Sequence, residues 1–213
     1  MIRLDNYSEI RLATLELESG HYLDLTSLLS LVRYHNRQRF GKIIDDNAER
    51  FMTAKGSTHN HQAWKGGYLD HVRETMNIAC QLYRTLNGLR KLPFQLSDAL
   101  EVMFLHDIEK PFKQEGFLVD SEGNKVEATK ANREQFRRNL IVKYDIKLTE
   151  EQDNAMKYVE GVPDNVYTPN FRIMRELAAF CHCCDILSAR LWHDRGQEID
   201  APEWERFEYK WQS

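Results

Sequence analysis

The segment from Gly67 to Gly88 constrains the fold most, because it keeps a helical period throughout. Its apolar residues recur at the i, i+3, i+4 spacing of an amphipathic helix: Val72, Met76, Ala79, Leu82 and Leu86. Pro and Gly, which interrupt helices, number only 5 and 10 in the 213 residues. The sequence therefore predicts a mainly α protein.

Similar periods and helix-end signals predict the other elements. Helices are expected at about 25–37, 42–53, 97–107, 130–144, 150–160 and 171–195. Thr149 and Gln152 have the spacing of a capping box at the start of the helix at 150–160. The segment 117–126, with Glu122-Gly123-Asn124 in its middle, predicts a small hairpin or extended insertion.

No internal repeat or Pro/Gly-rich linker divides the chain, and its length suits one sizeable core. We expect a single structural domain. In it, residues 1–55 supply N-terminal helices that pack on a core of residues 56–196, and residues 197–213 form a tail with a short helix.

The bulk properties narrow the class of partner. The formal charge of −4 gives no general attraction to nucleic acid or to anionic membranes. No stretch approaches the roughly 20 apolar residues of a membrane span. The first residues include acids and lack the apolar region of a secretory signal. We therefore expect a cytoplasmic protein whose four cysteines are thiols.

Polar residues whose side chains can bind a metal ion lie on three of the predicted apolar helices. Asp107 prolongs the apolar stripe of Leu100, Met103 and Phe104, and His106 precedes it. A carboxylate on a core-facing stripe is costly unless it has a cation or a dense set of hydrogen bonds as partner.

His71 shares a helix face with Tyr68, Thr75 and Leu82, and Asp185 is in line with Cys181 on the last long helix. Two His and two Asp form a mixed nitrogen and oxygen ligand set that suits Mn, Fe, Co, Ni or Zn. The alternative is four unrelated buried polar residues, each satisfied by hydrogen bonds.

The order His, His-Asp, Asp resembles the signature of the HD-domain phosphohydrolases. Residues 61–71, His-Gln-Ala-Trp-Lys-Gly-Gly-Tyr-Leu-Asp-His, are similar to the family pattern H-H-A-(aromatic)-x-G-G-L-L-E-H. Residues 105–110, Leu-His-Asp-Ile-Glu-Lys, are similar to L-H-D-I-G-K, and residues 184–189 are similar to the A-D-(apolar)-(apolar)-S-A motif. The resemblance covers residues 56–195 and implies the HD-domain helical bundle.

The resemblance also implies roles for individual residues. The implied metal ligands are His71, His106, Asp107 and Asp185. Asp107 is in addition a catalytic residue beside the attacking water, and Lys110 meets a phosphate oxygen of the substrate. Glu109 is a candidate for orienting water or donating a proton, against a solvated residue at a helix end. His61 is a candidate for substrate binding, against a loop or capping role.

Two departures from the family pattern bear on the metal. Gln62 replaces the second His of the paired motif, and Glu109 replaces Gly. Family members with two metals need further His ligands between the His-Asp pair and the last Asp, and this chain has no His from 108 to 181. We expect one tightly bound divalent transition metal, and a Mg²⁺ ion that arrives with the substrate is left open.

The expected function is hydrolysis of a phosphate ester. A nucleotide phosphohydrolase, of the nucleotidase or dNTP triphosphohydrolase type, is the first reading, with a small phosphorylated substrate. An HD-type phosphodiesterase or nuclease is the alternative, and the negative charge disfavours a nucleic-acid partner. A non-catalytic nucleotide-binding regulatory protein is the third reading. A homo-oligomer is left open.

Overall fold

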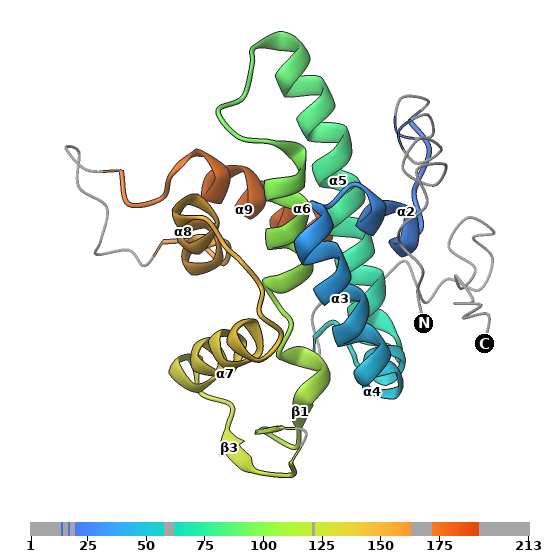
Figure 1. Ribbon diagram of the computed structural model, residues 1–213, viewed down its shortest axis with the longest axis vertical. Coiled ribbons are helices and arrows are strands. Elements are labelled where there is room, and N and C mark those ends of the chain that lie inside the picture. Colours follow the sequence, from blue (N-terminus) through green and yellow to red (C-terminus); the bar gives the residue numbers. More distant parts are fainter. Residues whose placement is uncertain are drawn as a thin grey trace.

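The computed structural model describes residues 14, 17, 20–57, 62–120, 122–162 and 172–191. The expected C-terminal short helix and His61 lie outside these residues. The described part is mainly helical (Figure 1), which confirms the predicted fold class at that level. Its helices are α2 (Leu25–Ser30), α3 (Tyr34–Asp46), α4 (Ala48–Thr53), α5 (Gly67–Leu89), α6 (Leu96–Leu105), the 3₁₀ turn η1 (Lys110–Phe112), α7 (Lys130–Lys143), α8 (Glu150–Tyr158) and α9 (Glu176–Leu191).

Helices α5, α6 and α9 pack on one another at the centre, where α5 is the long helix of Figure 1. Helix α8 lies against α6 and α9, and α2 and α4 contact α5. One continuous cluster of buried apolar side chains extends from Leu23 in the N-terminal part to Cys184 in α9. Among the described helices, none is both long and apolar enough to cross a membrane.

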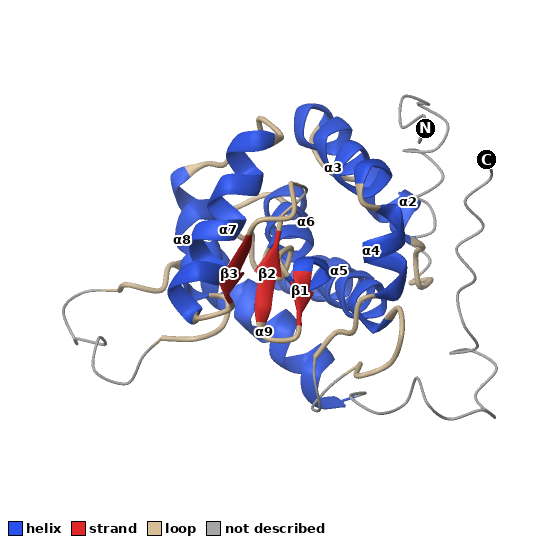
Figure 2. Ribbon diagram, turned by 90° about the horizontal axis from the view of Figure 1, so that it is seen from below, coloured by secondary structure: helices blue, strands red, loops and turns tan. Residues whose placement is uncertain are grey.

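A small antiparallel sheet lies beside α7 (Figure 2), with the strand order β1 (Lys113–Gln114), β2 (Phe117–Val119), β3 (Lys125–Glu127). Leu118 pairs with Lys113 on one side and with Val126 on the other. Strands β2 and β3 form the hairpin predicted at 117–126. Strand β1 was not predicted, because two polar residues carry no strand period.

Helices α5, α7 and α8 begin at the expected residues, and the capping box of Thr149 and Gln152 is present. The helix expected at 25–37 is wrong, since it is broken into α2 and α3 around Arg33. The Arg33 amide donates to Ser97 Oγ at 3.0 Å, and its guanidinium donates to Glu101. A tertiary contact therefore interrupts the local helical period.

The start of α5, which carries the Gly66-Gly67 pair, packs tightly against Gln62. Gly66 has φ +85°, in the left-handed region that favours glycine. A Cβ on Gly67 would lie 2.0 Å from the backbone oxygen of Gln62, and one on Gly56 would lie 2.8 Å from Gln62 Cβ. Because Gly56 and Gly67 have no side chains, Gln62 can lie directly against α5.

Two glycines of α5 give a matched test of this packing. Gly67→Ala should lower the free energy of unfolding by about 1–3 kcal/mol, because the added methyl meets backbone that cannot move cheaply. Gly88→Ala, with nothing within 4 Å of its Cβ, should instead stabilise by about 0.4–1 kcal/mol. Urea unfolding of both variants measures this, and equal effects in the two would contradict the packing at Gln62.

Candidate metal centre

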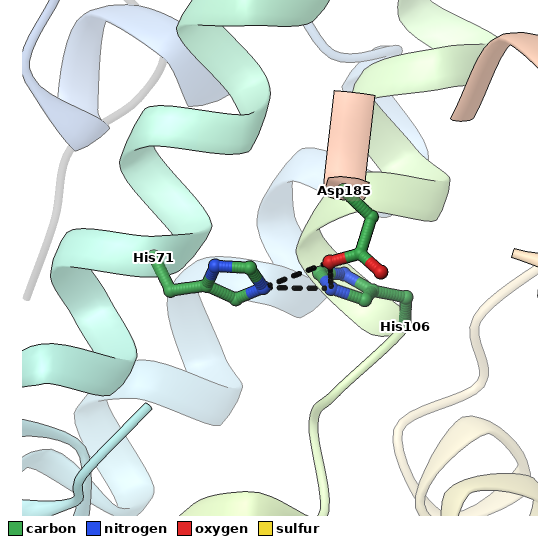
Figure 3. Close-up of side chains that lie close together, drawn as sticks. All are labelled: His71, His106 and Asp185. Carbon is green, nitrogen blue, oxygen red and sulfur yellow. Dashed lines mark hydrogen bonds and ion pairs between the residues drawn. The ribbon is translucent and has the colours of Figure 1, made fainter. Parts of the chain in front are cut away.

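Three ligand-bearing side chains converge from three different elements (Figure 3). His71 comes from the first half of α5, His106 from the C-cap of α6 and Asp185 from α9. His71 Nε2 lies 3.2 Å from His106 Nε2 and 3.2 Å from Asp185 Oδ1, and His106 Nε2 lies 3.5 Å from the same oxygen. Both imidazoles are fully buried.

Asp107 joins the same cluster. Its Oδ2 atom lies 3.5 Å from His71 Nε2 and 3.2 Å from His106 Nε2. The structure therefore brings Asp107 close to both imidazoles, whereas the group whose donor atoms all lie within 4.8 Å of one another consists of His71, His106 and Asp185. Lys110 Nζ also contacts Asp107 Oδ2, at 2.5 Å.

The spacing of these atoms fits a metal ion. Two donors bound at about 2.1 Å and about 100° apart lie roughly 3.2 Å from each other. The distances in the cluster, 3.2 to 3.5 Å, match that value. His71, His106 and Asp185 thus form a buried group that can hold a metal ion.

The ring nitrogen that faces away from the cluster, Nδ1, has a hydrogen-bond partner in each histidine. His106 Nδ1 lies 2.8 Å from the carbonyl oxygen of Met103, so Nδ1 carries a proton and donates. His71 Nδ1 lies 3.0 Å from Ser188 Oγ. Each imidazole therefore turns Nε2 toward the cluster while Nδ1 is held by a hydrogen bond, the usual arrangement behind a metal-binding histidine.

Without an ion, protons and an ammonium group balance the carboxylates. Burial lowers the pKa of His106, but Asp107 and Asp185 outweigh burial and raise it to about 10. Burial raises the pKa of Asp107, yet Lys110 and His106 hold it well below its usual range. The pKa of Asp185 is likewise below its ordinary value, because the neighbouring imidazoles of His106 and His71 outweigh burial.

Glu109 is buried, with 1% of its surface exposed. The alternative interpretation of Glu109 as a solvated residue at a helix end is therefore wrong. Among the described residues neither of its carboxylate oxygens has a hydrogen-bond partner, and Arg137 Nη1 of α7 lies 3.5 Å away. Burial, and next the negative charge of Asp107, raise the pKa of Glu109 to about 7. Arg137 also donates to the His106 carbonyl at 2.5 Å, which ties α7 to the end of α6.

A second layer of buried polar groups lies behind His71. Glu74 Oε2 accepts hydrogen bonds from Ser188 Oγ at 2.5 Å and from Gln62 Nε2 at 2.7 Å. Sequence analysis assigned no role to Glu74 or Ser188. Each stands one turn after a ligand on the same helix, Glu74 after His71 and Ser188 after Asp185, and that spacing is the signal that can find them.

His61 lies outside the described residues, so its predicted substrate contact stays a prediction. His182 of α9 points to the Val159 carbonyl, 2.6 Å from its Nδ1, and takes no part in the cluster.

No protein-family model, curated protein or solved structure matches the chain. Membership of the HD-domain family therefore stays an expectation from the motifs, and the residues of the cluster carry the proposal below.

Metal affinity should rise with pH, because His106 must lose its Nε2 proton before it binds an ion. A pKa of about 10 lies above the ordinary imidazole value, so the proton is bound in the metal-free protein at neutral pH, where it also contributes stability. That contribution is complete below about pH 6.5 and is lost as the pH rises through 10.

The dissociation constant for Zn²⁺ or Mn²⁺ should fall about tenfold per pH unit between roughly pH 6.5 and 9. Isothermal titration in buffers of different ionisation enthalpy should show about one proton released per ion. A pH-independent affinity with no proton release would contradict displacement of the His106 proton.

Proposed function

We propose that this chain is a metal-dependent hydrolase of phosphate esters, of the HD type. It holds one divalent transition metal ion, Mn, Fe, Co, Ni or Zn, with His71, His106, Asp107 and Asp185. The single observation that carries the proposal is the convergence of four nitrogen and oxygen donors within 3.5 Å of the imidazole nitrogens. A cluster of two imidazoles, the buried Asp107 and the partly buried Asp185 favours a divalent cation over a structural role.

A divalent ion, when bound there, makes a water molecule a better nucleophile and polarises a phosphoryl oxygen. His71, His106, Asp107 and Asp185 would hold the ion, and water and substrate would take the coordination positions that the protein does not fill. Asp107 lies at the edge of the cluster next to Lys110, so its carboxylate is placed to accept a proton from the attacking water.

Lys110 is the proposed contact for the phosphate group of the substrate. Its side chain is 19% exposed and its Nζ reaches Asp107 Oδ2, so the ammonium stands between the cluster and solvent. When a cation replaces it as the partner of Asp107, Lys110 is free to pair with an anionic oxygen of the substrate. Glu109, whose pKa is raised to about 7, is the proposed proton donor, held in place by Arg137.

A nucleotide is the proposed substrate, because its phosphate oxygens complete the coordination that four protein ligands leave open. An HD-type phosphodiesterase or nuclease is the second candidate, disfavoured by the net charge of −4. A regulatory nucleotide-binding protein is the third, disfavoured by the presence of all four donors. The proposal includes a cytosolic address, which the four free cysteines support.

Asp107→Asn should abolish hydrolysis and reduce bound metal while the fold survives, because an amide is a poor ligand and a poor base. Asp145→Asn is the matched control: Asp145 is exposed, has φ +52° and pairs with Arg39 away from the cluster. Elemental analysis of dialysed protein and a turnover screen over nucleotides, dinucleotides and short RNA measure both effects. One metal equivalent per chain is expected in the wild type, and full activity of Asp107→Asn would refute the proposal.

Lys110→Met should raise KM for the phosphate substrate with little change in kcat, because a ground-state contact is lost. Lys113→Met, which removes an exposed lysine of β1, should leave both constants unchanged. Steady-state kinetics decides it, and wild-type constants in Lys110→Met would place the substrate phosphate elsewhere.

A further inference from the structure

Glu74 is a buried carboxylate that the proposed chemistry does not use. It stands on α5 one turn after His71, and its side chain is nearly inaccessible to solvent. A carboxylate in such a position is stable only with hydrogen bonds from its surroundings. Ser188 Oγ donates to Glu74 Oε2 at 2.5 Å, and Gln62 Nε2 donates to the same oxygen at 2.7 Å.

Ser188 connects this carboxylate to the metal cluster. A hydroxyl has one proton and two lone pairs, and the proton of Ser188 goes to Glu74. The lone pairs face Gln62 Nε2 at 3.3 Å and His71 Nδ1 at 3.0 Å. His71 Nδ1 must therefore be the donor of its bond to Ser188. In the neutral ring, Nε2 is then left with a lone pair that faces the cluster.

We propose that Glu74 is a positioning residue that acts through Ser188 to fix the tautomer of His71. If the proton moved to Nε2 of His71, Nδ1 would have to accept from Ser188, and Glu74 would lose a donor. Burial raises the pKa of Glu74 to about 7, so its carboxylate is mainly ionised at about pH 8, and in that form it selects the one tautomer that can bind a cation. This inference rests on the proposed metal site and names the group that prepares one of its ligands.

Gln62 completes the network from the other side. An amide does not ionise near neutral pH, so its Nε2 donates to Glu74 whatever the protonation of the cluster. Its backbone is held against α5, because the missing side chains of Gly56 and Gly67 leave room for it. Gln62 thus keeps Glu74 aimed at Ser188 from the position where the family pattern has a histidine.

The two imidazoles, of His71 and His106, differ in the group that holds the Nδ1 proton. His106 Nδ1 donates to the backbone carbonyl of Met103, which no side-chain substitution removes. His71 Nδ1 depends on the hydroxyl of Ser188, which Glu74 orients. Changes at Glu74 should therefore alter His71 and leave His106 as it is, so His106 is an internal control in the same molecule.

The test compares three variants by nitrogen NMR of the histidine side chains in the metal-free full chain, at about pH 8, where the Glu74 carboxylate is mainly ionised. Glu74→Met keeps the length of the side chain and removes the acceptor. Glu74→Gln keeps an oxygen that can accept from Ser188. Glu101→Gln is the control, since Glu101 is equally buried on α6 but bonds to Arg33, Asn36 and Gln152.

In the wild type, His71 should carry its proton on Nδ1. Glu74→Met should populate the form with the proton on Nε2 and weaken Zn²⁺ or Mn²⁺ binding about 10–100-fold, the usual effect of losing a partner behind a ligand. Glu74→Gln should keep the wild-type tautomer and lose affinity only a few-fold. Glu101→Gln should change unfolding stability and neither of the other readouts.

The inference is overturned if wild-type His71 carries the proton on Nε2. It is also overturned if Glu74→Met matches Glu101→Gln, with reduced stability but unchanged tautomer and affinity. Failure of the proposed function has a separate signature. A wild-type protein that binds the ion and hydrolyses no phosphate ester refutes the activity, while the tautomer shift in Glu74→Met still supports the role of Glu74.

Discussion

Two carboxylates at the junction of three helices, Asp107 buried and Asp185 partly buried, are the constraint on which the structure depends. Asp107 and Asp185 each contact His71 where α5, α6 and α9 pack, and charges removed from water are unfavourable unless they are neutralised nearby. The ammonium of Lys110 and a proton on His106 supply that neutralisation in the metal-free chain. In the proposed metal-bound form, a cation takes over this neutralisation within the same helix packing.

The apolar period and local caps were enough to place most helices. Helices α7 and α8 begin where Thr129 and Thr149 accept from the third residue of the helix, which is a purely local signal. The break before α3 has no such signal. It depends on Arg33 bonding to Ser97 and Glu101, residues far along the chain, and no window of sequence around Arg33 contains them.

The candidate ligands were predictable because each stands on an apolar stripe or matches a motif. The residues that surround those ligands could not be predicted from the sequence. Glu109 looked like a helix-end residue because its partner, Arg137, comes from α7. Glu74 and Ser188 belong to two helices, and only the packing of α5 against α9 shows that Ser188 donates a hydrogen bond to Glu74. Residue types predict chemistry, whereas packing decides which groups meet.

The ending of α6 at Leu105 explains how neighbours in sequence serve one centre. Along a continuing helix, adjacent side chains diverge by about 100° and cannot face the same point. Here the chain turns after His106, and both His106 and Asp107 reach His71 Nε2. Transplanting the pair onto another scaffold therefore requires a helix terminus, with its unused carbonyl for the imidazole, and grafting it onto a helix surface would separate the two donors.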